Sequence, residues 1–316
     1  MSLDSFEIVY NDFNNKIASK KYDDALTLVP YLLQSAQSDL DVFYALMGKA
    51  TALTNLNLDD EVIETYDEII ENFEQTNNET IFKFLVYAYY NKALIYAKKG
   101  DFSKELNTYN ILLEKYIMDI SEDLEIVLAK AYMNKAICIG ELKEQKDAIL
   151  VYKELIKNFE NSLDDSVLLQ VINAAYNMAL IYGKNQQNKE SIKLYDYIIS
   201  KFETSTKDTI LEFVAKALVN KAARQKELDK YEEALKIYDE VVEKFENAKG
   251  IIVNQVALAL HNKSVLLGEL HKDKELLEVC NTIIEKFSNT NDEMIANIVA
   301  TAEVIKDKES FNKNIF

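Results

Sequence analysis

The sequence repeats a three-residue motif at an almost constant interval, and this repetition constrains the fold more than any other feature. A degenerate copy begins at Gly48, and the full copies begin at Asn91, Asn134, Asn177, Asn220 and Asn262, in steps of 43, 43, 43, 43 and 42 residues. An aromatic residue follows the same steps at Phe73, Tyr116, Phe159, Phe202, Phe245 and Phe287. A fixed period of this length indicates one supersecondary unit stacked on copies of itself.

Each repeat is predicted to be a pair of antiparallel helices. After Asn78, apolar residues recur at helical spacing up to Tyr96, Gly100 interrupts the pattern, and a second amphipathic run extends from Phe102 to Tyr116. Six Gly and one Pro in 316 residues fit long helices joined by short connectors. No single pair can bury its apolar face alone, so the predicted fold class is all-α: an α-solenoid of about seven stacked pairs with a C-terminal capping helix.

The repeats predict one solenoid domain over residues 1–316. Residues 4–37 keep a two-helix pattern but lack the Asn motif, so they are expected to form an atypical N-terminal unit. The long repeats occupy 38–287, a capping helix is expected at 288–305, and 306–316 is a charged tail. Terminal units of this kind cover the last apolar face of a repeat array.

Small and aromatic residues occupy fixed offsets within each repeat. One repeat has Ala93, Tyr96, the turn Gly100-Asp101-Phe102, Tyr109 and Leu112; the following repeats match with Ala136, Ala148 and Tyr152, with Ala179, Ser191 and Tyr195, and with Ala222, Tyr231, Ala234 and Tyr238. Over residues 5–305 this pattern resembles the tetratricopeptide repeat. The family's early Trp and closing Pro are absent, and about nine extra residues lengthen the first helix. HEAT-like helix pairs, which have a similar repeat length, are the alternative.

Composition limits the class of partner. The net charge of -17 disfavours nucleic acid and anionic membrane surfaces as ligands. Cys138 and Cys280 are far apart, which indicates neither a disulfide framework nor a zinc cluster. The N-terminal residues lack the pattern of a signal peptide, and no run of about 18 apolar residues occurs. A cytoplasmic location is therefore expected.

No catalytic constellation is found in the sequence. It contains no Gly-rich phosphate loop or HExxH motif, and its two histidines, His261 and His271, are ten residues apart. Cys280 replaces the repeated Tyr of the second helix, and Cys138 falls within a packed helical pattern. We therefore expect no enzymatic activity and no cofactor or metal.

The Asn of the motif shares one helical face with the residues four before, one before and three after it. In tetratricopeptide proteins this face lines the concave groove, so the resemblance implies a groove here that binds a protein or peptide. The expected groove residues are Asn91, Asn134, Asn177, Asn220, Asn262, Tyr87, Tyr90, Met133, Tyr176, Leu94, Ile137 and Leu180. An Asn amide offers a donor and an acceptor to the main chain of an extended peptide.

The Asn row also has a purely structural interpretation, in which each amide bonds only to the neighbouring helix pair. Asn lowers helix stability by about 0.5 kcal/mol relative to Ala, so its retention implies a compensating interaction in either case. The adjacent Lys49, Lys92, Lys135, Lys221 and Lys263 point to the packed side of the helix, where Glu68, Glu154, Glu240 and neighbouring acids of the second helices are candidate partners. Met178 replaces this Lys in one repeat, which indicates that the position needs an aliphatic stem.

The sequence thus predicts a non-catalytic interaction scaffold that binds a protein or peptide, with no role for nucleic acid or membrane; it does not predict the oligomeric state. The alternative is a regulatory sensor whose solenoid binds a signalling peptide and changes conformation. Such sensors usually carry a separate N-terminal segment, and residues 1–37 are too short for one. A hydrolase on a helical scaffold would need acids or His clustered in the groove, which the sequence does not show.

Overall fold

The described part of the protein consists of helices and the short loops that connect them. The computed structural model describes residues 5–119 and 121–313, apart from the side chains at 119 and 309–313. The chain divides into two compact units, Met1–Phe159 and Glu160–Phe316, called here the N-terminal half and the C-terminal half. Each half is considered by itself.

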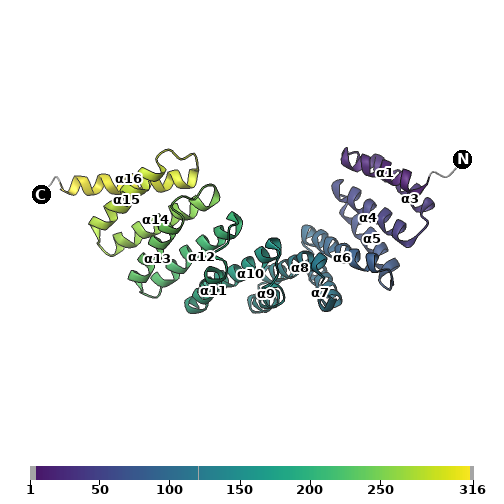
Figure 1. The fold of residues 1–316 in the computed structure, drawn as a ribbon, viewed down its shortest axis with the longest axis horizontal. Helices are drawn as coiled ribbons and strands as arrows, with labels where there is room; N and C mark the ends of the chain where they lie inside the picture. The colour runs from purple at the N-terminus through teal and green to yellow at the C-terminus, as the bar shows by residue number, and fades with distance from the viewer. Residues whose placement is uncertain (1–4, 120, 314–316) are drawn as a thin grey trace. The chain divides into compact units, whose positions relative to one another are not determined.

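Helices that follow one another in sequence pack against one another in both halves (Figure 1). The N-terminal half contains α1 (Phe6–Ala18), α2 (Tyr22–Leu26), α3 (Val29–Ser35), α4 (Asp39–Asn55), α5 (Asp59–Phe73), α6 (Glu79–Lys99), α7 (Phe102–Tyr116), the 3-10 turn η1 (Ile117–Asp119), α8 (Glu122–Glu141) and α9 (Gln145–Phe159). The C-terminal half contains α10 (Asp165–Lys184), α11 (Asn188–Phe202), α12 (Asp208–Lys226), α13 (Tyr231–Lys244), α14 (Ile251–Glu269), α15 (Asp273–Phe287) and α16 (Glu293–Lys313). From α4 to α15, even numbers are the first helices of repeats and odd numbers the second. The predicted all-α solenoid is confirmed.

The turn inside each repeat has a left-handed residue that keeps the period of the sequence motif. Positive φ angles of 52 to 70° occur at Asn57, Gly100, Lys143, Gln186, Asp229 and His271, in steps of 43, 43, 43, 43 and 42 residues. A residue in this conformation ends a helix and redirects the chain, so it sets the antiparallel pairing of the two helices. His271 is therefore a turn residue. Among these six turn residues, only Gly100 adopts a positive φ without the steric cost that a side chain brings.

Side chains at the helix starts satisfy backbone N–H groups. Ser38 and Asp41 form a reciprocal capping box at α4, and the Asn78 side chain accepts hydrogen bonds from the N–H groups of Thr80 and Ile81 at 3.0 and 3.1 Å. Each cap fixes where a first helix begins and thus which residues lie on each face.

The N-terminal unit differs from the predicted helix pair because its second helix is broken. The chain forms α2 and α3, which are separated at Thr27 and Leu28. Pro30 lies in the first turn of α3; it has no N–H to donate and disfavours the helical conformation of the residue before it. At the other end, α16 continues to Lys313, eight residues beyond Ile305, because no Gly or Pro interrupts it.

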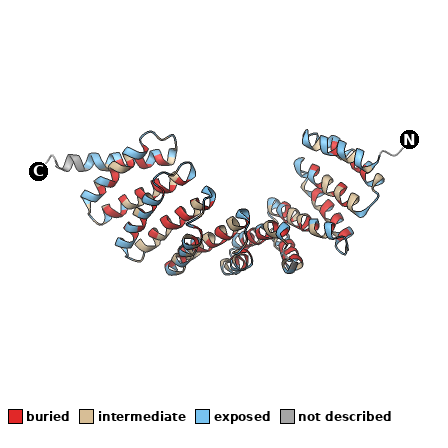
Figure 2. Cartoon of the chain, in the orientation of Figure 1, coloured by how far each residue is buried: buried red, intermediate tan, exposed pale blue. Residues whose placement is uncertain are grey.

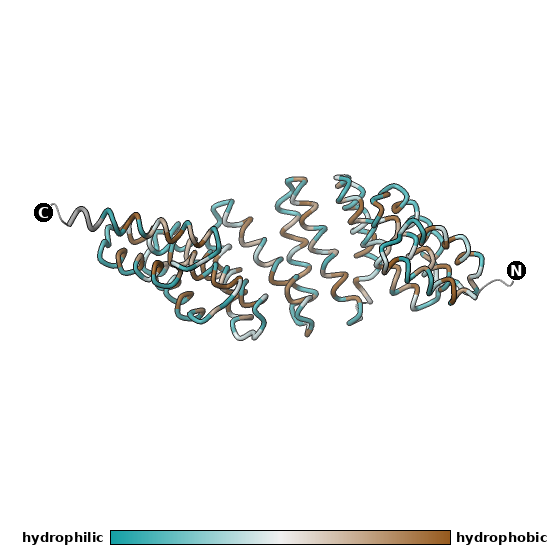
Figure 3. The backbone as a smooth tube through the Cα atoms, turned by 90° about the horizontal axis from the view of Figure 1, so that it is seen from above, coloured by the Kyte–Doolittle hydropathy of each residue, from teal (hydrophilic) through white to brown (hydrophobic). Residues whose placement is uncertain are grey.

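The core is a continuous layer between the helices of each half (Figure 2). The repeated aromatic residue at the end of each second helix is buried. The exposed fraction is 5% at the first copy, Phe73, and at most 8%, at the last copy, Phe287. Apolar and polar segments alternate along every helix, as expected for elements that bury one side (Figure 3). Two helices, α10 and α14, would be long and apolar enough to cross a membrane by length and composition, but 44% and 50% of their apolar windows are buried in the protein.

The degenerate motif at Gly48 has a packing cause. A Cβ atom added to Gly48 would lie 2.7 Å from the nearest ring atom of Phe13, whose side chain is 1% exposed. The N-terminal unit thus packs α1 so closely on α4 that no side chain fits at the position where later repeats carry Asn.

Gly48→Ala should therefore destabilise the protein, although alanine normally favours a helix. We expect a loss of about 1 kcal/mol in the free energy of unfolding, because overpacking of about 2 kcal/mol exceeds the helix gain of about 1 kcal/mol. Gly140→Ala is the matched control: it lies in α8 with no atom within 4 Å of the added Cβ, so it should gain stability. Urea denaturation measures both, and a stabilised Gly48→Ala variant would contradict the packing argument.

Candidate functional site

Four motif asparagines, Asn91, Asn134, Asn220 and Asn262, make hydrogen bonds to tyrosine hydroxyls of the preceding repeat. Asn134 donates through Nδ2 to Tyr109 and to Tyr90, each at 3.2 Å, and Asn220 donates through Nδ2 to Tyr176 at 2.9 Å. The side chains of Asn91 and Asn262 are bonded to Tyr66 and Tyr238. Burial raises the pKa of these tyrosines, to about 12 for Tyr238, and the amide bond partly offsets this.

In these bonds the amide nitrogen Nδ2 is the donor, and the amide oxygen Oδ1 of Asn134 and Asn220 is left as an unused acceptor. Asn220 Nδ2 also donates to the carbonyl of Lys216 at 2.9 Å, and a carbonyl can only accept, so the orientation of this amide is fixed. Neither Asn134 nor Asn220 accepts a hydrogen bond through Oδ1 from the described residues. All five motif asparagines are partly exposed. At Asn134 and Asn220 the two interpretations are thus compatible: Nδ2 joins the repeats, and Oδ1 is available to a ligand.

The other expected groove residues separate into two groups. Leu94, Ile137 and Leu180 are 37%, 46% and 44% exposed on their first helices, so they present an aliphatic side chain to solvent once per repeat. Tyr90 and Tyr176, by contrast, accept the bonds from Asn134 and Asn220, and Met133 is 6% exposed. These three side chains therefore mainly stabilise the packing of the repeats and offer little surface to a ligand.

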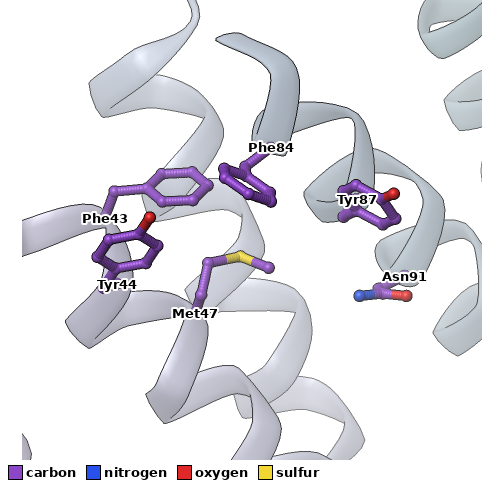
Figure 4. A pocket seen from close by; sticks show the side chains of 6 residues that line it. All are labelled: Phe43, Tyr44, Met47, Phe84, Tyr87 and Asn91. Atoms are coloured by element: carbon purple, nitrogen blue, oxygen red, sulfur yellow. The ribbon is translucent and has the colours of Figure 1, made fainter. Parts of the chain in front are cut away.

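The N-terminal half has a hollow of ≈ 300 Å³ between α4 and α6, called here the aromatic hollow. It is lined by Phe43, Tyr44, Met47, Phe84, Tyr87 and Asn91. Figure 4 shows the α4 side chains projecting toward Phe84 and Tyr87 of α6. The rings of Tyr44 and Phe84 are 6.4 Å apart and those of Phe84 and Tyr87 6.3 Å apart. Phe84 is 41% exposed, which is unusual for so large an apolar ring.

A second hollow of ≈ 230 Å³ adjoins Asn91 on the same pair of helices and is called here the polar hollow. It is lined by Thr51, Thr54, Asn55, Tyr66, Asn91, Leu94 and Ile95. Asn91 borders both hollows, so an apolar site and a hydrogen-bonding site lie next to each other along one face. In the C-terminal half, the ring at the register of Phe84 is Phe213, and the Lys216 ammonium covers it at 4.9 Å.

Sequence reasoning missed most residues of both hollows because the first repeat has Gly48 in place of Asn. The same helical face can nevertheless be counted from Gly48: Tyr44 is four before it, Met47 one before it and Thr51 three after it. Phe84 precedes Asn91 by two helical turns and also lies on this face. The helical spacing in the sequence therefore places these residues on the same face, once the face is counted from Gly48 as well as from the full copies of the motif.

The lysines beside the motif Asn lie against second helices, as expected. Lys49 pairs with Glu68 at 3.5 Å, and Lys221 pairs with Asp196 at 2.6 Å. Lys92 pairs with Asp67, and Lys263 pairs with Asp239 rather than with the expected Glu240. The preferred partner is the acid directly after the repeated Tyr of the preceding second helix, because that carboxylate faces the next first helix.

Lys135 differs from these lysines because the residue at that register is Asn110, which has no charge. No acid lies within 4 Å of its ammonium among the described residues, and burial lowers its pKa while the more distant Glu154 raises it in part. A lysine whose pKa is lowered by folding destabilises the folded state wherever it stays charged. This cost is present in full at neutral pH, begins to fall as the pH rises through the lowered folded pKa, and is gone above the ordinary value of 10.5.

Lys135→Met should therefore stabilise the protein at pH 7 by about 0.5–1 kcal/mol, since Met keeps the aliphatic stem without the buried charge. Lys92→Met is the matched control, because it breaks the pair with Asp67 and should be neutral or slightly destabilising. Chemical denaturation of both variants tests this difference. Equal losses in the two variants would show that the charge of Lys135 is well compensated.

The described residues hold no candidate cluster for a metal ion. They contain no group of three or more His, Cys, Asp or Glu side chains that could hold a metal ion. Burial raises the pKa of the Cys138 thiol to about 12 and also raises that of Cys280, so neither is an activated nucleophile.

Comparison with known proteins finds similarity to solved structures. No protein-family model matches the chain, and no curated protein matches it. Among solved structures, the apo form of RapI aligns over 92% of this chain and 79% of its own, with a TM-score of 0.61 and 13% identity. A tetratricopeptide repeat protein from Parabacteroides merdae ATCC 43184 aligns over 94% and 98%, with a TM-score of 0.48 and 13% identity. The tetratricopeptide-like fold expected from the sequence is confirmed.

Proposed function

We propose that this protein is a non-catalytic interaction scaffold that binds a peptide segment of a partner protein on the first-helix face of its N-terminal half. It acts in the cytoplasm, toward protein rather than nucleic acid or membrane, as its net charge of -17 favours. The tetratricopeptide-like fold makes a protein-interaction role the expected one, and the surface of α4 and α6 supplies the site.

The exposed aromatic hollow is the observation that carries this proposal. Phe84, at 41% exposed, borders a hollow large enough for an apolar side chain, and such a surface on a soluble protein is characteristic of an interaction site. Leu94 and Ile137 extend the apolar surface along neighbouring first helices, and Asn134 Oδ1 can accept a hydrogen bond from a peptide N–H. Apolar anchoring and main-chain pairing are thus available on one face.

Site-specific photo-crosslinking in cells tests the proposal. A photoreactive phenylalanine analogue at Leu94 is compared with the same analogue at Ile111, which is equally exposed at 40% but lies on the second helix α7. The Leu94 variant should crosslink to discrete proteins, and an added Phe84→Ala change should remove these products. Equal products from Ile111, or products that survive Phe84→Ala, would contradict a site on the first-helix face.

A further inference from the structure

Both threonine hydroxyl groups of the polar hollow already donate their hydrogens to backbone carbonyls of α4. Thr51 Oγ1 donates to the carbonyl of Met47 at 2.9 Å, and Thr54 Oγ1 donates to that of Ala50 at 2.7 Å. Asn55 Nδ2 donates to the carbonyl of Thr51 at 2.9 Å. Both threonine hydroxyl oxygens and the Asn55 amide oxygen therefore remain as acceptors, and the α4 wall of the hollow suits a ligand group that donates hydrogen bonds.

The local electrostatics favour a positive charge in the same place. Thr54 and Asn55 are the last residues of α4, and the C-terminal end of a helix carries a partial negative charge. No basic residue lies in the last turn of α4, and no residue that lines the hollow is positively charged. The site thus has hydrogen-bond acceptors and a negative potential but no cation of its own.

A neighbouring contact shows that an ammonium group can be held at this end of α4. Lys98 extends from α6 and donates to Asn57 Oδ1 at 3.0 Å and to Asp59 at 2.7 Å. Asp59 neutralises this lysine, so it does not supply a charge to the polar hollow. The Tyr66 ring, 4% exposed, closes one wall and can contribute a cation–π contact.

We propose that the partner segment carries an arginine or lysine side chain that occupies the polar hollow while an apolar side chain occupies the aromatic hollow. This inference rests on the proposed function and names the chemistry of its ligand. An acidic chain with a net charge of -17 also attracts a basic segment at long range. The two hollows are displaced by about seven residues along α4 and α6, or about 10 Å at 1.5 Å per residue. In an extended peptide this corresponds to a separation of about three residues between the cation and the anchor.

The test uses dodecapeptides selected from a random phage-displayed library on the immobilised full chain. Selected sequences should contain Arg or Lys about three residues from an aromatic or aliphatic residue. In a synthetic copy, replacing that Arg by citrulline, which has the same shape without the charge, should weaken binding about tenfold by isothermal titration calorimetry. Replacement by Glu should abolish binding.

Variants of the protein test whether the preference for Arg over citrulline arises at the polar hollow. The double variant Thr51→Val, Thr54→Val should reduce the difference between the Arg and citrulline peptides to about twofold while the apolar anchor still contributes. Thr301→Val is the matched control, because Thr301 on α16 is exposed and donates to the carbonyl of Asn297 in the same way; it should leave the tenfold difference unchanged.

The outcomes distinguish this inference from the proposed function. Peptides that bind and lose affinity with Phe84→Ala, but show no preference for Arg over citrulline or prefer Glu, would overturn the cationic ligand and leave the scaffold function intact. Peptides whose binding ignores Phe84→Ala, or a chain that selects no peptide, would overturn both.

Discussion

Asn134→Ala should lower the free energy of unfolding by about 1.5–2.5 kcal/mol. The Tyr109 hydroxyl is fully buried, and Asn134 makes the one hydrogen bond to it within the described residues. Losing the amide leaves that hydroxyl unsatisfied at a cost of about 2–3 kcal/mol, and the better helix propensity of alanine returns about 0.5 kcal/mol. Thermal and urea denaturation measure the difference. Asn110→Ala, at an exposed position of α7, is the control and should be neutral or stabilising.

A double-mutant cycle separates this bond from other effects of the substitution. Tyr109→Phe removes the buried hydroxyl itself, so adding it to Asn134→Ala should recover about 1 kcal/mol of the loss. If the two single changes add without coupling, or if Asn134→Ala is as stable as the unmodified chain, the amide does not join the repeats. In that case the Asn row serves a ligand alone.

Glu105→Gln should stabilise the protein by about 1–2 kcal/mol at pH 7 to 8. The Glu105 side chain on α7 is 4% exposed, and no basic group pairs with it among the described residues. Burial raises the pKa of its carboxyl above the ordinary value of 4.5, and a hydrogen bond with Cys138 lowers it only in part. An acid with a raised folded pKa binds its proton more tightly in the folded state, so the ionised form costs stability.

The pH dependence of this gain has a defined sign. Below pH 4.5 the carboxyl is neutral in both the folded and the unfolded chain, so Gln should give little advantage. Stability of the unmodified protein should fall as the pH rises from 4.5 through the raised folded pKa, and the advantage of Gln should grow over the same window. Glu114→Gln, exposed on the same helix, should show no such growth. A Glu105→Gln variant that is less stable at pH 8 than at pH 4, relative to the unmodified chain, would contradict this assignment.

The fold was predictable because the repeat imposes it at several independent positions. The Asn motif and the terminal aromatic already give a period of 43 residues, and the left-handed turn residues from Asn57 to His271 repeat it in the structure. The break between α2 and α3 was not anticipated, although Pro30 in the sequence is its cause. A single proline inside an amphipathic run should have outweighed the periodicity around it.

The candidate site was only partly predictable from the sequence. Counting along the helix placed Leu94, Ile137 and Leu180 on an exposed face, because helical geometry is regular. It could not show that Nδ2 of Asn134 bonds to Tyr109, since that contact depends on how adjacent repeats pack. It also could not show the hollows beside Asn91, which form where the α4 and α6 side chains leave space between them.

The face that binds the ligand can be observed directly by methyl NMR of the full chain during titration with a selected dodecapeptide. The account predicts that the methyl signals of Met47 and Leu94 shift because these residues line the hollows, and that Ile137 shifts because it is exposed on the next first helix, α8. Those of Ile111 and Leu150, which are 40% and 56% exposed on the second helices α7 and α9, should remain unchanged. Shifts at Ile111 and Leu150 with unchanged Met47 and Leu94 would place binding on the opposite face and contradict the account.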